Sequence, residues 1–268
     1  MSYTDVKRGL PSHKTRVIAT INQKGGVGKS TTVINLAACL GEANKKVLIV
    51  DFDPQGNATS GLGYTVKPEE NTIYEALSLQ CLASDAIRHL KRPSMDLMPA
   101  NINLAGADLE LAGIDGEREK RFKEVLEPIK DNYDFIIVDC PPSLGLLNTN
   151  ALTAASSVLI PVQCEYYALE GVSLLLQTIR VVQKLFNPQL KIEGILLTMY
   201  DARTRLSADV AQDVYKHFKE KAYKTYIPRN VKISESPSAG MSIYDYDMNC
   251  EGAKAYVALT KEVLDNNA

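Results

Sequence analysis

One short segment, a glycine-rich turn between an apolar run and a helical pattern, constrains the fold of this chain most. Residues 16–21 are apolar and β-branched, residues 22–28 read Asn-Gln-Lys-Gly-Gly-Val-Gly, and a helical pattern opens at Lys29. Strand, glycine turn and helix in this order are the context of a phosphate-binding loop. Glycines let backbone N–H groups close around a phosphate, and the helix adds its positive end. We therefore predict that residues 24–31 bind ATP with Mg²⁺.

Two side chains at the start of this helix carry the predicted chemistry. Lys29 supplies a positive charge for the β- and γ-phosphates, and the Ser30 hydroxyl is placed to ligate Mg²⁺. The usual pattern, G-x-x-x-x-G-K-[ST], has glycine where this chain has Gln23, and Lys24 follows. A plain glycine turn before a helix is the alternative interpretation. The length of the match and its strand–helix setting favour the phosphate loop.

Carboxylates end two further apolar runs. The second run leads into Asp51-Phe52-Asp53-Pro54, where carboxylates at a spacing of two point the same way if the backbone is extended. One of them can support the metal shell or Lys29, and the other can orient an attacking water. The alternative, that Asp53 and Pro54 only start a turn, explains one carboxylate but not two. Residues 135–139, Phe-Ile-Ile-Val-Asp, have the form of a Walker B strand, in which Asp139 holds Mg²⁺, commonly through water.

The pattern along the chain predicts an α/β fold. Continuously apolar runs are typical of strands buried on both faces of a parallel sheet, and helical patterns separate them. We expect a doubly wound, mostly parallel sheet with helices on both faces, the P-loop NTPase class. We also expect a loose tail over residues 1–14 and one ATPase domain over residues 15–268. The expected strands are 16–21, 46–51, 95–99, 134–139, 157–162, 193–199 and 224–227, and the clearest helices 29–42, 169–186, 207–219 and 252–264.

Composition and charge narrow the class of protein. No apolar run approaches the length that spans a bilayer, and the scattered cysteines contain no C-x-x-C pair, which fits a reducing cytosol. The net charge is −2, yet residues 200–232 hold eight Lys/Arg against four Asp/Glu. This excess suggests a surface that binds a polyanion, but basic residues on a solvated helix would look the same. Charge alone leaves both interpretations open.

Longer motifs now give a family resemblance. The chain resembles the ParA/Soj/MinD group of deviant Walker ATPases in residues 24–30, 51–57 and 139–142, and the short ParA type in residues 161–171, 197–204 and 227–231. The resemblance runs from about residue 15 to the end of the chain. It implies a homodimer that sandwiches ATP, in which Lys24 is the signature lysine that reaches the partner's phosphates. It also implies these contacts: Gly25, Gly26, Val27, Gly28, Lys29, Ser30, Thr31 and Thr32 to phosphates and Mg²⁺, Asp139 in the outer metal shell, Asp53 to the hydrolytic water, and Pro228 and Asn230 to adenine.

The resemblance further implies partners. The ATP-bound dimer of such proteins binds double-stranded DNA without sequence preference. A ParB-type centromere-binding protein stimulates hydrolysis, and the cycle moves chromosomes or plasmids apart. The family's two DNA-binding positions match Arg203 and Lys232, and the second is commonly arginine. The implied location is the cytoplasm, in association with the nucleoid.

Two alternatives within the same superfamily fit the sequence less well. A MinD-like ATPase that cycles on membranes needs a basic amphipathic C-terminal helix with large apolar residues. Residues 252–264 carry small apolar residues and two lysines, and are expected to pack instead. A metallocluster carrier needs paired cysteines, and none is evident. Glu165 and Tyr166 are interpreted as loop packing rather than nucleotide contacts.

Overall fold

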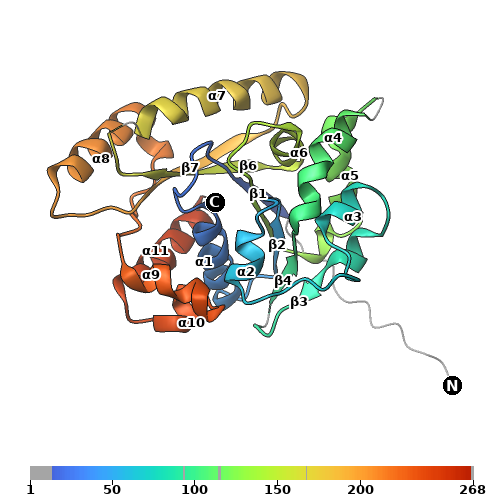
Figure 1. Ribbon diagram of the computed structural model, residues 1–268. Coiled ribbons are helices and arrows are strands. Elements are labelled where there is room, and N and C mark those ends of the chain that lie inside the picture. The colour runs from blue at the N-terminus through green and yellow to red at the C-terminus, as the bar shows by residue number, and fades with distance from the viewer. Residues whose placement is uncertain (1–13, 93, 114–115, 167, 267–268) are drawn as a thin grey trace.

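The computed structural model describes residues 14–92, 94–113, 116–166 and 168–266 (Figure 1). The predicted tail therefore lies almost entirely outside the described residues, as does Tyr167. Within the described part the strands form one sheet in the order β3-β4-β2-β5-β1-β6-β7, and every pairing is parallel except that of β3 with β4. The strands are β1 Arg16–Thr20, β2 Val47–Asp51, β3 Arg88–His89, β4 Met95–Met98, β5 Phe135–Asp139, β6 Ser157–Gln163 and β7 Lys191–Thr198.

Helices connect the parallel strands and cover the sheet, whereas a short connection joins β3 to β4. The α-helices are α1 Lys29–Glu42, α2 Asn57–Gly61, α3 Ile73–Leu77, α4 Ala107–Ala112, α5 Arg121–Leu126, α6 Leu146–Ala154, α7 Ala168–Leu185, α8 Arg205–Phe218, α9 Val231–Glu235, α10 Ile243–Asp247 and α11 Glu251–Asp265. Short 3₁₀ turns are η1 Ala83–Ala86, η2 Ile102–Gly106, η3 Arg118–Lys120, η4 Lys130–Asn132, η5 Lys219–Lys221 and η6 Ser236–Ala239.

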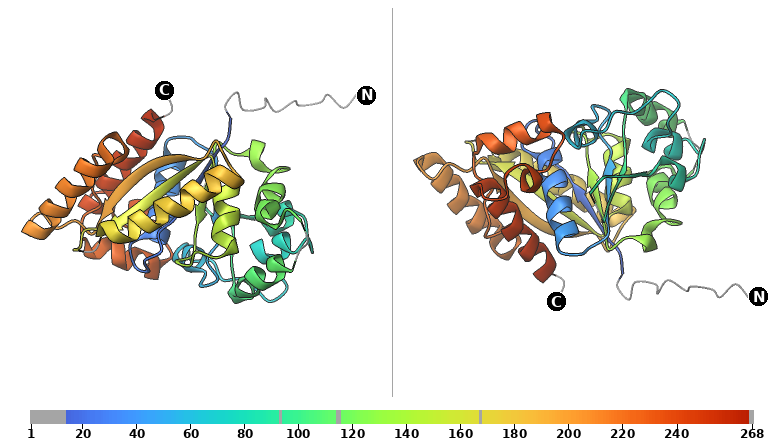
Figure 2. Two further views of the ribbon diagram at one scale, coloured as in Figure 1. Left: turned by 90° about the horizontal axis from the view of Figure 1, so that it is seen from above. Right: turned by 90° about the horizontal axis from the view of Figure 1, so that it is seen from below.

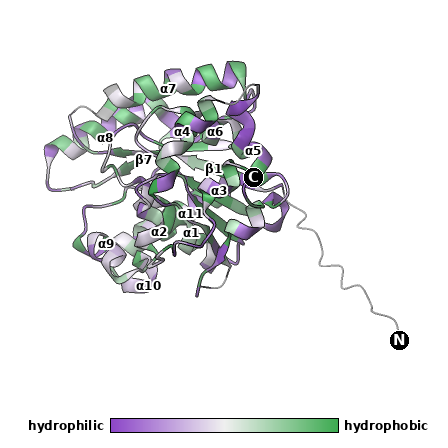
Figure 3. Cartoon of the chain, turned by 45° about the vertical axis from the view of Figure 1, so that its right-hand side comes forward, coloured by the Kyte–Doolittle hydropathy of each residue, from purple (hydrophilic) through white to green (hydrophobic). Residues whose placement is uncertain are grey.

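Helices cover both faces of the sheet (Figure 2), and an apolar core lies between the sheet and the helices on each face. Successive residues of β1 alternate between them, so that Ile18 joins α1 and α11 while Val17 and Ala19 join α6 and α7. Figure 3 shows hydrophobic residues filling the central strands, whereas α7 alternates hydrophobic and hydrophilic residues along its length. That alternation is expected of a helix with one face on the sheet and the other in solvent.

Helix α1 differs from α7 because it is buried nearly all round. Residues 32–40 are all buried, between the sheet on one side and α11 on the other. Helix α11 buries Tyr256, Leu259 and Val263 in the same core, so the C-terminal helix packs as the sequence predicts. Among the described residues no helix is both long and apolar enough to cross a membrane.

The sheet confirms the predicted fold class and six of the seven predicted strands. Lys224–Ile227 is not a strand. Isolated bridges flank this segment, one between Ile195 of β7 and Ala222 and one between Pro228 and Tyr200, which follows β7. Between the two bridges, the stretch from Ala222 to Pro228 is one residue longer than the stretch from Ile195 to Tyr200, so the two cannot pair as a continuous ladder. Pro228 also has no N–H with which to extend the pairing. The sequence also missed β3, because two polar residues carry no periodic signal.

Candidate nucleotide site

The phosphate loop, residues 24–31, follows β1 and takes the backbone shape that its glycines allow. Gly26 has φ 76° and Gly28 has φ 88°, both in the left-handed region that favours glycine. Gly28 caps α1, and its carbonyl accepts from the Thr32 N–H at 2.9 Å. The first turn of α1 therefore begins at Lys29, with its free N–H groups at the loop.

Neighbouring strands hold the loop in place. The Thr198 hydroxyl, at the end of β7, donates to the Val27 carbonyl at 2.9 Å. The buried Asn22 amide donates to the Pro161 carbonyl of β6 at 2.7 Å. Both contacts join segments far apart in the sequence, so no local motif could have revealed them. They fix the loop against the carboxyl ends of the strands, where open α/β sheets bind their ligands.

A cleft of about 570 Å³ opens above the loop. From the loop it is lined by most of the predicted nucleotide residues, Gly25, Gly26, Gly28, Lys29, Ser30 and Thr31. The cleft is also lined by Gln55, Asn57 and Met199, from segments that carry the family resemblance, and by residues that the sequence did not single out, Ile34, Ser60, Gly61, Pro237 and Ser238. Asp53 and Pro142 also line it, from the segments that follow β2 and β5. The cleft thus gathers the three predicted motifs around one space.

Lys29 is a buried cation without a direct counter-ion. Its ammonium donates to the Lys24 carbonyl at 3.2 Å, and no carboxylate of the described residues forms an ion pair with it. Burial lowers its pKa, and the charges of Asp139 and Asp53 partly oppose that shift. A cation in this setting is stabilised by an anion in the cleft.

Two buried carboxylates face each other at the ends of β2 and β5, where Asp51 and Asp139 are register partners. Asp51 is satisfied: it accepts from the Thr59 N–H at 2.8 Å and hydroxyl at 2.7 Å. Asp139 is not, since neither of its oxygens has a hydrogen-bond partner among the described residues. Burial raises the pKa of Asp51 to about 6. Burial and the charge of Asp51 raise the pKa of Asp139, while Ser30 and Lys29 oppose this.

These contacts differ from the prediction that the Asp51 and Asp53 carboxylates point the same way, one to support the metal shell or Lys29 and the other to orient the attacking water. Only Asp53 lines the cleft, where it also accepts from the Gln55 N–H at 3.0 Å. Asp51 holds Thr59 of α2 instead. The reason is that β2 ends at Asp51, so the extended spacing of two does not continue to Asp53.

The orphaned carboxylate gives a test of whether Mg²⁺ fits. Asp139 offers two unpaired oxygens next to Ser30, the hard oxygen donors that Mg²⁺ prefers. No group of three or more His, Cys, Asp or Glu among the described residues forms a metal cage. That combination suits Mg²⁺, which keeps several waters and takes its other ligands from phosphates. The residues therefore fit the ion as a companion of a nucleotide.

Lys24 lies beside this cleft rather than in it. Its N–H donates to the Asn22 side chain at 3.0 Å, and its carbonyl accepts from Lys29. Its side chain is 52% exposed and forms an ion pair with Glu165. Glu165 therefore does more than pack, although it lies where the sequence placed it, after β6.

Four other predicted nucleotide residues, Val27, Thr32, Pro228 and Asn230, also lie outside the cleft lining. Thr32 is buried, with its hydroxyl 3.5 Å from that of Tyr256. Asn230 caps α9 by accepting from the Lys232 N–H at 2.9 Å, and Pro228 forms the bridge to Tyr200. Their contacts with adenine and phosphate stay predictions.

The two predicted DNA-binding cations are exposed but already paired. The Arg203 guanidinium, 87% exposed, donates to both oxygens of Asp201 at 2.9 and 2.7 Å. These bonds hold the pKa of Asp201 at about 2. Lys232 lies 3.5 Å from Glu235 and over the ring of Tyr246. Figure 1 shows α8 and α9, which bear or border these cations, on the same side of the molecule.

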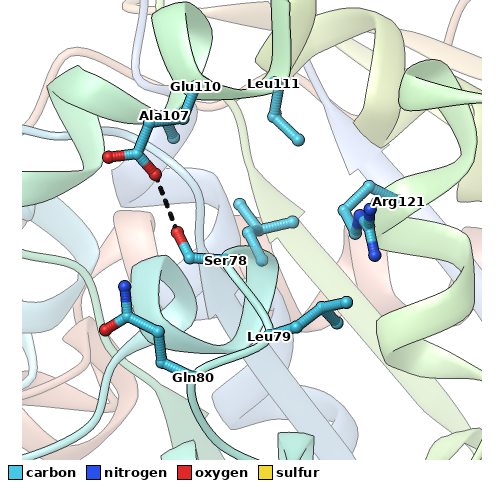
Figure 4. Close-up of a pocket in the computed structure, with 8 residues that line it drawn as sticks. Ser78, Leu79, Gln80, Ala107, Glu110, Leu111 and Arg121 are labelled. Atoms are coloured by element: carbon cyan, nitrogen blue, oxygen red, sulfur yellow. Dashed lines mark hydrogen bonds between the residues drawn. The ribbon is translucent and has the colours of Figure 1, made fainter. Parts of the chain in front are cut away.

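A second cavity, of about 350 Å³, lies between α3, α4 and α5 (Figure 4). Its Glu110 carboxylate already accepts from the hydroxyls of Tyr74 at 2.6 Å and Ser78 at 3.0 Å. Leu77, Leu79 and Leu111 make much of the wall. It has neither a glycine loop nor a buried lysine, so its chemistry does not suit a nucleotide.

Comparison with known proteins gives consistent matches. A sequence-family model described as an AAA domain matches residues 15–192. The chain is 55% identical to the sporulation initiation inhibitor protein Soj of Bacillus subtilis over 251 residues, which cover 94% of this chain and 99% of that protein. It is 50% identical to the chromosome partitioning protein ParA of Myxococcus xanthus, covering 93% of this chain and 88% of that protein.

Solved structures show the same fold. A cobyrinic acid a,c-diamide synthase from Mycobacterium smegmatis, with bound ATP analogue and magnesium, is 40% identical with a TM-score of 0.82, and the match covers 94% of this chain and 95% of that one. The cell division ATPase MinD of Pyrococcus furiosus is 28% identical with a TM-score of 0.75, covering 94% and 99%.

Proposed function

The chain belongs to the ParA/Soj family of chromosome-partitioning ATPases in the MinD/ParA P-loop superfamily, and from this membership we propose how its site works. It binds ATP with Mg²⁺ in the cleft above the phosphate loop and hydrolyses it. Binding joins two copies, the dimer binds DNA without sequence preference, and a ParB-type protein stimulates hydrolysis and so releases the dimer. The cycle segregates chromosome or plasmid DNA from a position on the nucleoid.

One observation carries the nucleotide part of this proposal. Within the described part of the chain, the buried Lys29 of the cleft lining forms no ion pair, and the oxygens of the nearby buried Asp139 have no hydrogen-bond partner. Each is costly to leave unpaired, so the site favours a ligand that satisfies both groups. A phosphate chain with Mg²⁺ would do so, because Lys29 and the loop N–H groups would hold the phosphates, while Ser30 and, through water, Asp139 would hold the ion.

The chain's own groups would divide the chemistry of hydrolysis. The N–H groups of Gly26 and Gly28 and the Lys29 ammonium hold the phosphates and stabilise the charge that develops on them. Mg²⁺, held by Ser30 and through water by Asp139, would add positive charge at the β- and γ-phosphates. Asp53, which lines the cleft, orients the attacking water. Pro142 closes the same cleft and would sense the γ-phosphate.

In this proposal, residues outside the cleft make the contacts between the two copies and with DNA. The Lys24 side chain does not line the cleft of its own chain, which suits an action on the nucleotide of a second copy. Arg203, just before α8, and Lys232, in α9, are exposed cations, and these two helices lie on the same side of the molecule (Figure 1). Exposed cations are sufficient to neutralise DNA phosphates when no base is contacted. A MinD-like membrane cycle has less support, because α11 uses its apolar side chains in the core.

DNA binding by the full chain with ATP, ADP or no nucleotide, across a salt series, tests the proposal. ATP with Mg²⁺, but not ADP, should give binding to unrelated sequences, with affinity that falls as salt rises. Sedimentation in the same three states reports the dimer. Equal DNA binding in all three states would refute the proposed cycle.

A further inference from the structure

Two hydrogen bonds hold the backbone of Lys24 in place, so only its side chain can move. Its N–H is bonded to the Asn22 side chain, and its carbonyl is bonded to the Lys29 ammonium. Asn22 is itself buried and anchored to β6 through the Pro161 carbonyl. The loop therefore cannot carry Lys24 to a new place, but rotation about its side-chain bonds can redirect the ammonium.

Glu165 lies where it can control that redirection. It follows β6 directly, two residues after Gln163, and its N–H donates to the Gln163 carbonyl at 2.9 Å. Its side chain is 29% exposed and forms an ion pair with the Lys24 ammonium. Among the described residues, this is the carboxylate that pairs with Lys24. The segment that leads into α7 thus holds the lysine against its own chain.

We propose that Glu165 is a latch: it holds Lys24 in the single chain and competes with the phosphates of the nucleotide bound by a second chain. This inference rests on the proposed function, in which Lys24 acts across a dimer. Lys24 cannot pair with Glu165 and contact a second chain's phosphates with full strength at once. Dimerisation must therefore break the ion pair, and Glu165 opposes dimerisation until ATP supplies a stronger anion.

The strength of the latch sets the effect to be measured. The lysine is half exposed, so the pair belongs to the range of partly solvated ion pairs rather than of buried ones. Removing the ion pair should change the accessibility of the Lys24 ammonium and the dimerisation constant roughly two- to fivefold. The effect should shrink as salt rises, because solvent-exposed charges are screened.

Amine labelling of the nucleotide-free chain tests the latch without any need for dimerisation. Brief acetylation with an amine-reactive ester, read by mass spectrometry, compares the labelling of Lys24 with that of Lys46 in the same sample. In Glu165→Gln, labelling of Lys24 should rise roughly two- to fivefold. Glu251→Gln is the matched control, because it frees Lys254 from a similar exposed pair and should leave Lys24 unchanged. Unchanged Lys24 labelling in Glu165→Gln would show that no latch exists.

Dimerisation then tests its consequence. With Mg²⁺ and a non-hydrolysable ATP analogue, Glu165→Gln should reach half-dimer at a protein concentration roughly two- to fivefold lower than the unmodified chain. Glu165→Asp, which keeps the negative charge, should reach half-dimer at a concentration closer to that of the unmodified chain. Glu251→Gln should reach half-dimer at the same concentration as the unmodified chain. Equal or weaker dimerisation of Glu165→Gln, with Lys24 labelling raised, would overturn the inference.

Lys24→Ala distinguishes a failure of the proposed function, in which Lys24 acts across the dimer, from a failure of the Glu165 latch alone. If Lys24→Ala dimerises and hydrolyses ATP normally, the action of Lys24 across the dimer is wrong, and the proposed function fails at that point. If Lys24→Ala is defective while Glu165→Gln dimerises like the unmodified chain, only the latch fails. Defective Lys24→Ala together with tighter Glu165→Gln supports both.

Discussion

At the scale of single residues, the site depends on two buried charged groups. Within the described part of the chain, Lys29 forms no ion pair and Asp139 accepts no hydrogen bond. Lys29 and Asp139 were predictable from sequence because each sits in a contiguous motif that also fixes its structural context. The pairing of Lys24 with Glu165 was not, because it joins two loops that only the sheet brings together. The Asp51–Thr59 contact was missed for the same reason. Local motifs specify residue types, but tertiary contacts decide which groups remain free to bind a ligand.

Replacing Lys29 should separate binding from folding. In Lys29→Ala we expect ATP affinity to fall by about 100-fold or more, the scale for removing a close charge partner. The fold should persist, because Lys29 forms no ion pair within the described structure. Isothermal titration with Mg·ATP checks the affinity, with the exposed Lys46→Ala as control. ATP affinity within a few-fold of the unmodified chain would remove Lys29 from the site.

Replacing Asp139 should stabilise the empty protein while it weakens the site. The folded-state pKa values of Asp51 and Asp139 are raised, so the folded chain binds more protons than the unfolded one at acidic pH. The two carboxyls therefore add to the unfolding free energy at low pH, where both are protonated in the folded chain. This contribution is lost as the pH rises from about 4 to 6 and beyond, because each carboxyl then ionises inside the fold. Asp139→Asn should therefore raise the nucleotide-free unfolding free energy at pH 8 by on the order of 1 kcal/mol, the scale of one pKa unit, and less at pH 5.

Thermal unfolding of the two proteins at pH 5 and pH 8, without nucleotide, measures this difference. Asp139→Asn should also gain less stability from Mg·ATP than the unmodified chain does. A variant that is less stable at pH 8 than the unmodified chain would contradict the idea that Asp139 is held there at a cost.

At the scale of elements, the strand and helix patterns located most of the fold. The bounds of α1 agree with the prediction at both ends because a glycine in the left-handed region fixes its start and the chain turns at its end. The prediction failed where an element depends on its neighbours: residues 224–227 have strand composition but meet β7 at isolated points. Pro237 lines the cleft without any sequence signal, since only the packing of distant elements brings it there.

One bond between elements gives a prediction at this scale. Thr198→Val keeps the volume of a buried side chain but removes the donor that ties β7 to the Val27 carbonyl. A lost hydrogen bond of this kind amounts to about 1 kcal/mol, so ATP affinity should fall roughly fivefold as the loop loosens. Thr178→Val, which removes an exposed hydroxyl of α7, is the control. Titration with Mg·ATP measures both, and equal affinities would show that β7 does not hold the loop.

At the scale of the whole molecule, charge distribution matters more than net charge. The chain carries −2 overall, so DNA binding has to come from a local excess such as that of residues 200–232. Sequence alone could not choose between a DNA surface and a solvated helix. The structure adds that Arg203 and Lys232 are both exposed and both next to carboxylates, so the effective charge of this surface is smaller than a count of lysines and arginines suggests.

Freeing one of these cations should strengthen DNA binding. In Asp201→Asn the Arg203 guanidinium loses its bidentate partner and becomes available to a phosphate. We expect ATP-dependent DNA affinity to rise severalfold and the salt dependence to steepen, by about one unit of log–log slope per added phosphate contact. Arg203→Glu should do the opposite while dimerisation with ATP is retained.

The control for this prediction is Glu127→Gln, which removes a carboxylate from an exposed pair with Lys130 in the segment after α5. It lowers the negative charge of the chain by the same amount as Asp201→Asn. DNA affinity measured by fluorescence anisotropy over a salt series distinguishes the two possible causes. If both variants tighten binding equally, net charge alone drives association with DNA. If only Asp201→Asn does, the surface that includes Arg203 contacts the phosphates, and the asymmetry seen first in the sequence has a functional meaning.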